Sequence, residues 1–284
     1  MPKSSQIVIN SSCSLDELTI LDLDQDCLQK IFEYLSIYEL IESEKVCETF
    51  QLTCERVYSS KKFHRMRIEL RYLKTEYFKD IFERIGSSLR DFEFSGGYIM
   101  DEVVKQTMIE GVTKKCSKLK SLSINYVQFN TDSFIKLQPS FCNLKLLDLS
   151  RCGISEVSLD NIELDGEKFR SVKTLKLAGN SCMTGSLFKN MKHVESLDIS
   201  YCYNLSFFEF LKFVKNCVKL TELDVSASCQ LVSEDENFLE IILSHQPNIE
   251  KLKMDNTGIA RDEETLKKFK NLKFASFEGR KFGL

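Results

Sequence analysis

The chain has 284 residues, of which 43% are hydrophobic, and this length is sufficient to bury a sizeable core. Its formal net charge of -3 at pH 7 and its sequence pI near 5.8 argue against a general nucleic-acid-binding protein. No apolar run reaches the ~18 residues that a membrane span requires, so we expect no membrane partner.

Residues 1–19 are rich in serine and lack the apolar core of a signal peptide. We expect a disordered N-terminal segment here. The missing leader predicts a protein of the cytoplasm, the nucleus or both.

Residues 20–56 have a helical pattern. Leu28, Ile31, Phe32 and Leu35 recur at i, i+3, i+4 and i+7, which places them on one face of a helix. A second apolar set follows, comprising Leu40, Ile41, Val46, Cys47 and Phe50. Two or three short helices amount to fewer than ~40 residues, too few for a stable core of their own. This region therefore needs a partner or the rest of the chain.

Residues 57–284 repeat a phrase of the form Leu-x-x-Leu-x-Leu, whose successive copies start 22 to 30 residues apart. The last two apolar residues of each phrase, such as Leu122 and Ile124, alternate along a short strand and point inward. One unit cannot bury its apolar face alone, so the copies must stack into a solenoid.

The position three residues after the last strand leucine holds Cys152, Asn180 and Cys202 in the central copies, and we expect it to form a turn. Helical segments are predicted between the strands at 75–85, 100–115, 206–216, 233–244 and 262–269. Ser233 and Glu236 have the spacing of a capping box. The predicted fold is an α/β solenoid with parallel strands on its concave face and helices on its convex face.

The eleven cysteines do not indicate a disulfide framework, since their number is odd and no Cys-x-x-Cys pair occurs. Five of them recur at related repeat positions, and we interpret these as reduced core or turn residues: Cys116, Cys152, Cys202, Cys217 and Cys229.

No catalytic constellation is present in the sequence. It contains no glycine-rich phosphate loop, no Cys/His metal-binding spacing and no nucleophile elbow. His64, His193 and His245 are scattered. We therefore predict a protein that is not an enzyme and binds no metal or cofactor.

Side chains beside the inward leucines are expected to line the concave face. The side chains expected to contact a bound protein there are Tyr126, Arg151, Lys176, Tyr201, Glu222, Lys251 and Lys253. Tyrosine and arginine are enriched at interface hot spots, so Tyr126, Arg151 and Tyr201 are the favoured three. Asp148, Asp198 and Asp224 share one repeat position, which is also explained by solvation at the strand edge.

Both ends of the repeat region are basic, at residues 57–74 and 265–284. Solvated surface explains these clusters. An acidic or phosphorylated partner is the alternative explanation.

The repeats resemble the leucine-rich-repeat family, in its longer, cysteine-containing subtype found in intracellular proteins. The resemblance covers roughly residues 60–284 and rests on the phrase and on the Asn/Cys turn position. It implies a binding surface, since this fold serves many different partners.

Residues 23–35, together with Glu39-Leu40 and Val46-Cys47, resemble the F-box. The family pattern reads Leu-Pro-x-Glu-x-Leu-x-x-Ile-Phe-x-Tyr-Leu, then Asp-Leu, then Val-Cys and an aromatic residue. Asp24 replaces the proline of the pattern and Phe50 its customary tryptophan. These changes predict the loss of a preset turn and a smaller ring in the core.

The F-box resemblance implies a small helical module whose exposed apolar part docks on the Skp-family adaptor of a cullin-RING ubiquitin ligase. The residues implied are Leu23, Leu28, Ile31, Phe32, Leu35, Leu40, Val46 and Cys47. The repeats would hold a protein substrate destined for proteasomal degradation. Two alternatives stay open: a leucine-rich-repeat scaffold whose N-terminal helices only cap the solenoid, and an F-box protein with a role outside ubiquitin transfer.

Overall fold

A computed structural model describes residues 19–97, 99–155, 167–186, 191–228, 237–259, 262–278 and 280–283. The chain forms two compact units, Met1–Val57 and Tyr58–Leu284. The predicted disordered segment lies outside the described residues except for Thr19, as do Cys229 and the predicted capping box of Ser233 and Glu236.

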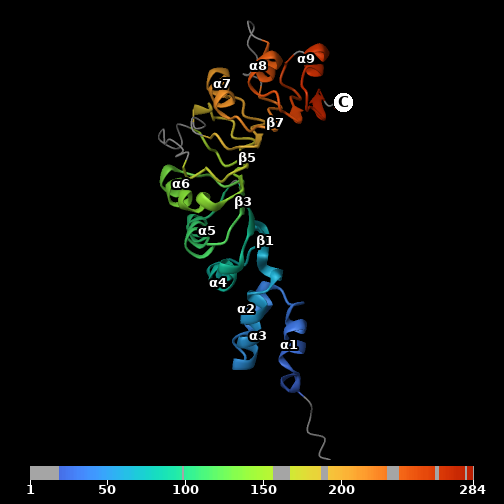
Figure 1. Cartoon of the computed structure of the whole chain (residues 1–284). Helices are drawn as coiled ribbons and strands as arrows, with labels where there is room; N and C mark the ends of the chain where they lie inside the picture. The colour runs from blue at the N-terminus through green and yellow to red at the C-terminus, as the bar shows by residue number, and fades with distance from the viewer. Residues whose placement is uncertain are drawn as a thin grey trace, which may run out of the picture. The chain divides into compact units, whose positions relative to one another are not determined.

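The first unit is helical (Figure 1). A 3-10 turn at Ile20–Asp22 precedes α1 (Gln25–Phe32), α2 (Ile37–Ser43) and α3 (Glu48–Tyr58), whose last residue already belongs to the second unit. This is the short helical module that the apolar spacing predicted.

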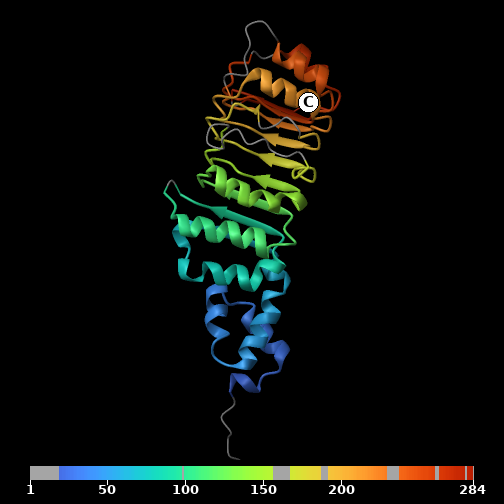
Figure 2. The same cartoon turned by 90° about the vertical axis from the view of Figure 1, so that its left-hand side faces the viewer.

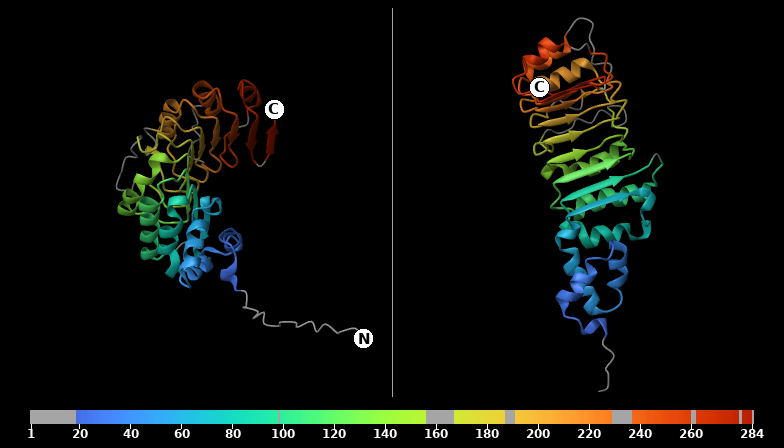
Figure 3. Two further views of the ribbon diagram at one scale, coloured as in Figure 1. Left: turned by 60° about the horizontal axis from the view of Figure 1, so that its bottom comes forward. Right: turned by 90° about the vertical axis from the view of Figure 1, so that its right-hand side faces the viewer.

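The second unit contains one ten-stranded sheet whose strands follow each other in chain order. The strands are β1 (Arg65–Glu69), β2 (Asp91–Ser95), β3 (Ser121–Asn125), β4 (Leu146–Asp148), β5 (Thr174–Lys176), β6 (Ser196–Asp198), β7 (Glu222–Asp224), β8 (Lys251–Lys253), β9 (Phe274–Phe277) and β10 (Arg280–Gly283). Strands β1 to β9 are parallel. Within this unit helices cover one face of the sheet (Figure 2), and the strands line the other, inner face (Figure 3).

The repeat phrase sets the register of the sheet. Leu147 of β4 lies opposite Leu122 of β3 and Leu175 of β5, and all three side chains are buried. The same row continues in both directions through Phe92, Leu197, Leu223, Leu252 and Ala275. Stacking the repeats thus joins their apolar positions into one continuous core, and the predicted solenoid is confirmed.

Six helices connect the strands on the outer face. They are α4 (Phe78–Ile85), α5 (Glu102–Lys115), α6 (Thr131–Leu137), α7 (Phe207–Asn216), α8 (Phe238–His245) and α9 (Glu263–Lys267), counted within the described residues. All except α6 overlap a predicted segment. Helix α6 begins after Asn130, which accepts a hydrogen bond from the Ser133 amide, and it buries Phe134 and Leu137. Its capping box has serine at the third helical position, where the usual capping-box pattern has glutamate or glutamine, so the sequence did not indicate this helix.

The turn position after each strand is a buried hydrogen-bonding site. Asn180 accepts hydrogen bonds from the amides of Cys152 and Ile154 at 3.0 Å each, and its amide nitrogen donates to the carbonyls of Leu149 and Leu177 at 3.0 and 2.7 Å. Its side chain therefore links two consecutive repeats.

Cysteine at the same turn position makes fewer bonds. The thiols of Cys152 and Cys202 donate to the carbonyls of Ile124 and Leu177. Burial raises the pKa of each thiol to about 12, which keeps it protonated and unreactive at neutral pH. The four described cysteines of the predicted set are buried free thiols: Cys116, Cys152, Cys202 and Cys217.

The last parallel strand is paired on both sides. Strand β10 turns back and pairs antiparallel with β9, so that Phe282 lies opposite Ala275. A paired strand satisfies the backbone edge of β9, which parallel stacking alone would leave open.

Candidate functional site

Asp24 and Ser36 begin the first two helices. The Asp24 carboxylate accepts a hydrogen bond from the Cys27 amide at 2.8 Å, and this bond lowers the pKa of Asp24. Ser36 caps α2 in a reciprocal box with Glu39. An N-cap aspartate thus defines the helix start at the position where the F-box pattern has proline.

A small apolar core holds the helical module together. Leu28, Phe32, Leu40 and Ile41 are each at most 3% exposed. Phe32 meets Phe50 edge-on, with ring centroids 4.9 Å apart and planes at 82°. The smaller ring at Phe50 therefore still makes an aromatic contact with the stripe of α1.

The eight residues implied as adaptor contacts fall into three groups. Leu28, Phe32 and Leu40 are buried, and Leu35 and Cys47 are half-buried. The three exposed members are Leu23 (41%), Ile31 (43%) and Val46 (67%). The buried members build the module, and the exposed ones are available to a partner.

Further exposed apolar side chains in this module were not identified from the sequence. They are Ile20, Leu21, Tyr34 and Leu52. The apolar spacing identified Leu28 and Phe32, which are buried. Tyr34 matches the tyrosine of the F-box pattern but lies off the apolar face. Exposed aliphatic and aromatic groups gathered in one short module are typical of a protein-binding surface.

Charged side chains at both ends of the inner face pair across neighbouring strands. Arg65 lies 2.8 Å from Asp91, and Arg67 lies 3.3 Å from Glu93.

The same arrangement recurs toward the C-terminus. Lys251 binds Glu222, and Lys253 lies 3.2 Å from Asp224. The Lys251 ammonium lowers the pKa of Glu222. Three of the predicted substrate contacts, Glu222, Lys251 and Lys253, are therefore engaged with neighbouring strands.

The aspartates at the shared repeat position close turns. Asp148 accepts hydrogen bonds from the amide and hydroxyl of Ser150 at 3.0 and 2.6 Å, and Asp198 binds Ser200 in the same way. Lys176 lies between them in register, and no ion pair within 4 Å joins it to a described carboxylate. The shared aspartates thus have a local structural role that solvation alone did not anticipate.

Tyr126, Arg151 and Tyr201 lie just past the strands and not within them. Each has φ of 58°, in the left-handed region. Their amides donate to the carbonyls of Ser150, Ala178 and Ser226 in the following repeats. These three residues therefore do not belong to the strand alternation, because a left-handed residue turns the chain away from the extended conformation.

These three side chains come together in one hollow of about 510 Å³, which we call the Arg151 hollow. Its lining includes Tyr126, Gln128, Arg151, Cys182, Tyr201 and Tyr203. It also includes Gly97, Gly153, Ser155, Gly179 and Ser181. The sequence predicted three of these side chains but missed Gln128, Cys182 and Tyr203, which follow the turn and lie outside the repeat phrase.

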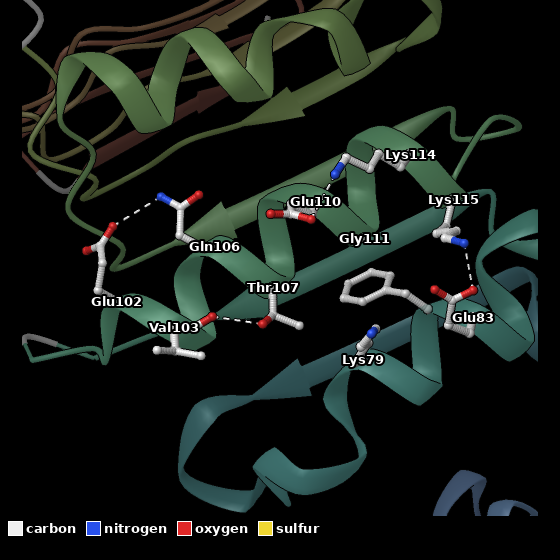
Figure 4. A pocket seen from close by; sticks show the side chains of 11 residues that line it. Lys79, Glu83, Glu102, Val103, Gln106, Thr107, Glu110, Gly111, Lys114 and Lys115 are labelled. Carbon is white, nitrogen blue, oxygen red and sulfur yellow. Dashed lines mark hydrogen bonds and ion pairs between the residues drawn. The ribbon is translucent and has the colours of Figure 1, made fainter.

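A second hollow, of about 620 Å³, lies between α4 and α5 on the helical face (Figure 4). Most of its charged side chains are paired, since Lys115 binds Glu83 at 2.6 Å and Lys114 binds Glu110 at 2.9 Å. Phe82 is 2% exposed and offers little apolar surface. Among the described residues of this lining, Lys79 is the one charged side chain without an ion pair.

The described residues include no group of three or more His, Cys, Asp or Glu placed to hold a metal ion. Among those residues, no helix has the length and hydropathy to cross a bilayer.

Comparisons with known proteins agree with both units. A family model of the F-box domain matches residues 20–62. A chain of the crystal structure of the Rad7 and Elc1 complex in yeast is similar in fold, with a TM-score of 0.59 and 15% identity over 91% of this chain. The present chain spans 65% of the length of that chain.

A second solved structure, the leucine-rich repeat-containing protein LegL7 from Legionella pneumophila, matches with a TM-score of 0.49 and 14% identity, over 87% of this chain and 84% of that chain. A comparison with curated protein sequences gave no significant match.

Proposed function

We propose that this chain is the non-catalytic substrate-recognition subunit of an SCF-type ubiquitin ligase. The helical module would bind a Skp-family adaptor and, through it, a cullin-RING ligase. The repeats would bind a target protein and direct it to proteasomal degradation. The observation that carries the proposal is an F-box match at residues 20–62 directly followed by a leucine-rich-repeat-like solenoid.

The exposed apolar residues of the module support the adaptor half of the proposal. Leu23, Ile31 and Val46 remain accessible although the core of the module is complete. Docking of such anchors into a groove would contribute about 1.5 to 3 kcal/mol for each side chain fully buried. The solved structure of similar fold is itself a complex, of Rad7 with Elc1, which is compatible with a chain that works in an assembly.

The inner face of the solenoid supports the receptor half. Its charges are paired at both ends, and the Arg151 hollow opens beside the middle strands. A surface of this kind binds and positions a protein, and ubiquitin transfer would occur at another subunit. Residence in the cytoplasm, the nucleus or both accords with this role and stays a prediction.

Co-purification with a Skp-family adaptor tests the proposal. The variant Ile31→Asp/Val46→Asp places two charges on exposed positions and spares the buried Phe32. We expect a stable complex with the wild-type chain and its loss in the variant, because a charge in an apolar groove must be desolvated. Val218→Asp is the matched control, since Val218 is an exposed apolar residue of the repeats at 72%.

Circular dichroism would establish that all three proteins are folded. A folded wild-type chain that fails to bind any Skp-family adaptor would contradict the ligase role and favour the repeat scaffold. Adaptor binding without accelerated turnover of any bound protein would instead favour an F-box protein outside ubiquitin transfer.

A further inference from the structure

The Arg151 guanidinium is held in place, and no described carboxylate lies within ion-pair distance of it. Its Cζ lies 5.2 Å from the centre of the Tyr126 ring. A Cβ at Gly179 would come within 2.7 Å of Arg151 Cγ, so the glycine leaves room for the arginine stem. Contacts with both neighbouring repeats therefore limit the freedom of this side chain before any ligand binds.

This lack of a partner sets Arg151 apart from the arginines at the start of the sheet. Arg65 and Arg67 each pair with a carboxylate of β2, whereas Arg151 makes no ion pair with any residue of the described ranges. An ordered guanidinium with free donors is well suited to bind an anion through two parallel hydrogen bonds.

Tyrosines supply apolar surface next to this cation. Tyr201 and Tyr203 are 45% and 49% exposed, and their rings meet edge to face with centroids 6.5 Å apart. Half-exposed rings held by such contacts offer contact area at a small entropic cost. The hollow therefore combines the Arg151 guanidinium with the exposed aromatic surface of two tyrosine rings.

The charges around the hollow favour a carboxylate over a phosphate. Among the described residues that line it, Arg151 is the one arginine or lysine. On the adjoining strands, Asp148 and Asp198 flank Lys176, so these strands contribute a net negative charge. Phosphate groups, with a charge near -2, are usually bound by several cations. A single carboxylate matches a single guanidinium.

The length of the hollow fits a short stretch of extended chain. Tyr126 and Tyr201 are separated by three repeat steps, from β3 to β6. At ~4.8 Å between strands the hollow spans about 14 Å, which corresponds to roughly four residues at ~3.3 Å each.

We propose that the Arg151 hollow binds an extended acidic segment of a partner protein. One Asp or Glu side chain of that segment pairs with Arg151, and an adjacent apolar side chain lies against Tyr201 and Tyr203. The proposal builds on the proposed receptor function and specifies the class of segment that the receptor selects.

A display library of random octapeptides, panned on the full-length chain, tests this inference without a known substrate. We expect the enriched peptides to contain Asp or Glu next to an aromatic or aliphatic residue. Their affinity should fall by about tenfold or more in Arg151→Gln, which removes the charge-assisted hydrogen bonds. Panning on Arg151→Glu should enrich Lys or Arg at the same place. Arg65→Gln is the matched control and should leave the affinity unchanged.

Two results would overturn the inference. One is an enriched set without an acidic preference, or with unchanged affinity for Arg151→Gln. The other is tighter binding when phosphoserine replaces the selected Asp or Glu, which would make the site a phosphate site. Adaptor co-purification of Arg151→Gln separates the two proposals, because the variant should still bind the adaptor through Ile31 and Val46. If adaptor binding is intact but the peptide results contradict the inference, only the proposal for the Arg151 hollow is rejected, and the proposed function is not.

Discussion

Replacement of Asn180 should cause a large loss of stability. The side chain is fully buried and makes four hydrogen bonds, two from its oxygen and two from its nitrogen. Asn180→Ala leaves the Cys152 and Ile154 amides without their side-chain acceptor. Each unsatisfied buried group costs about 1 to 3 kcal/mol, so we expect a loss of roughly 3 to 5 kcal/mol in the free energy of unfolding.

Serine at this position should be less damaging than alanine. Ser228 occupies the equivalent turn one repeat beyond Cys202, where its hydroxyl donates to the Ile199 carbonyl at 2.8 Å and accepts from the Cys202 amide at 3.3 Å. Asn180→Ser should therefore lower the free energy of unfolding by only about half as much as Asn180→Ala. Asn204→Ala, at an exposed position, should change stability by less than about 0.5 kcal/mol.

Urea denaturation followed by circular dichroism would measure these differences. Because repeat proteins can unfold in parts, amide hydrogen exchange at Cys152 and Ile154 should accompany it. The order of stability should be wild type, Asn180→Ser, Asn180→Ala. The reasoning would be refuted if the free energy of unfolding of Asn180→Ala were within about 1 kcal/mol of the wild-type value and both amides were still protected from exchange. The Asn180 hydrogen bonds would then not be a main stabilising contact between repeats.

Two further predictions concern packing and pH. Gly111→Ala would place a Cβ 2.2 Å from the Phe82 ring and should destabilise the fold by about 1 to 3 kcal/mol in thermal unfolding. At Gly97 the nearest atom is 3.9 Å away, so Gly97→Ala should be nearly neutral. Equal effects of the two changes would contradict the close contact between Gly111 and Phe82. Burial raises the pKa of the Cys152 and Cys202 thiols from 9.0 to about 12. As the pH rises, the unfolded chain therefore loses these protons before the folded chain does. The free energy of unfolding should fall from pH ~9 upward by roughly 1 kcal/mol per pH unit for each thiol. Denaturation between pH 8 and 10 should show a shallower decline in the Cys152→Ala/Cys202→Ala variant, and equal slopes would contradict the protonated buried state.

In the first unit, the apolar spacing predicted a helix but not which residues of its apolar face are exposed. The spacing of Leu28 and Phe32 predicted a helix, and both residues are buried on it. The same stripe also contains Ile31, which is 43% exposed. A period of 3.6 residues identifies an apolar face, but the position of the neighbouring helices decides which part of that face remains accessible.

In the repeat region, by contrast, the spacing of apolar residues predicted their arrangement in the structure. The phrase period alone determined which residues pair across the sheet, since Leu122, Leu147 and Leu175 lie opposite one another as their spacing predicts. Alternation along a strand has a period of two residues, so a buried face specifies the register strongly.

The geometry beyond the strand ends could not be predicted from the repeat pattern. Left-handed geometry at Tyr126, Arg151 and Tyr201 has no signature in side-chain type, because residues other than glycine rarely adopt it. Likewise, Arg65 pairs with Asp91 although they lie 26 residues apart. The solenoid and its core could be predicted from the sequence because a periodic apolar pattern repeats the same local requirement. The hollow depends on where successive repeats stack, which a single repeat does not encode. The same holds for the Arg151 guanidinium, which forms no ion pair with a described residue.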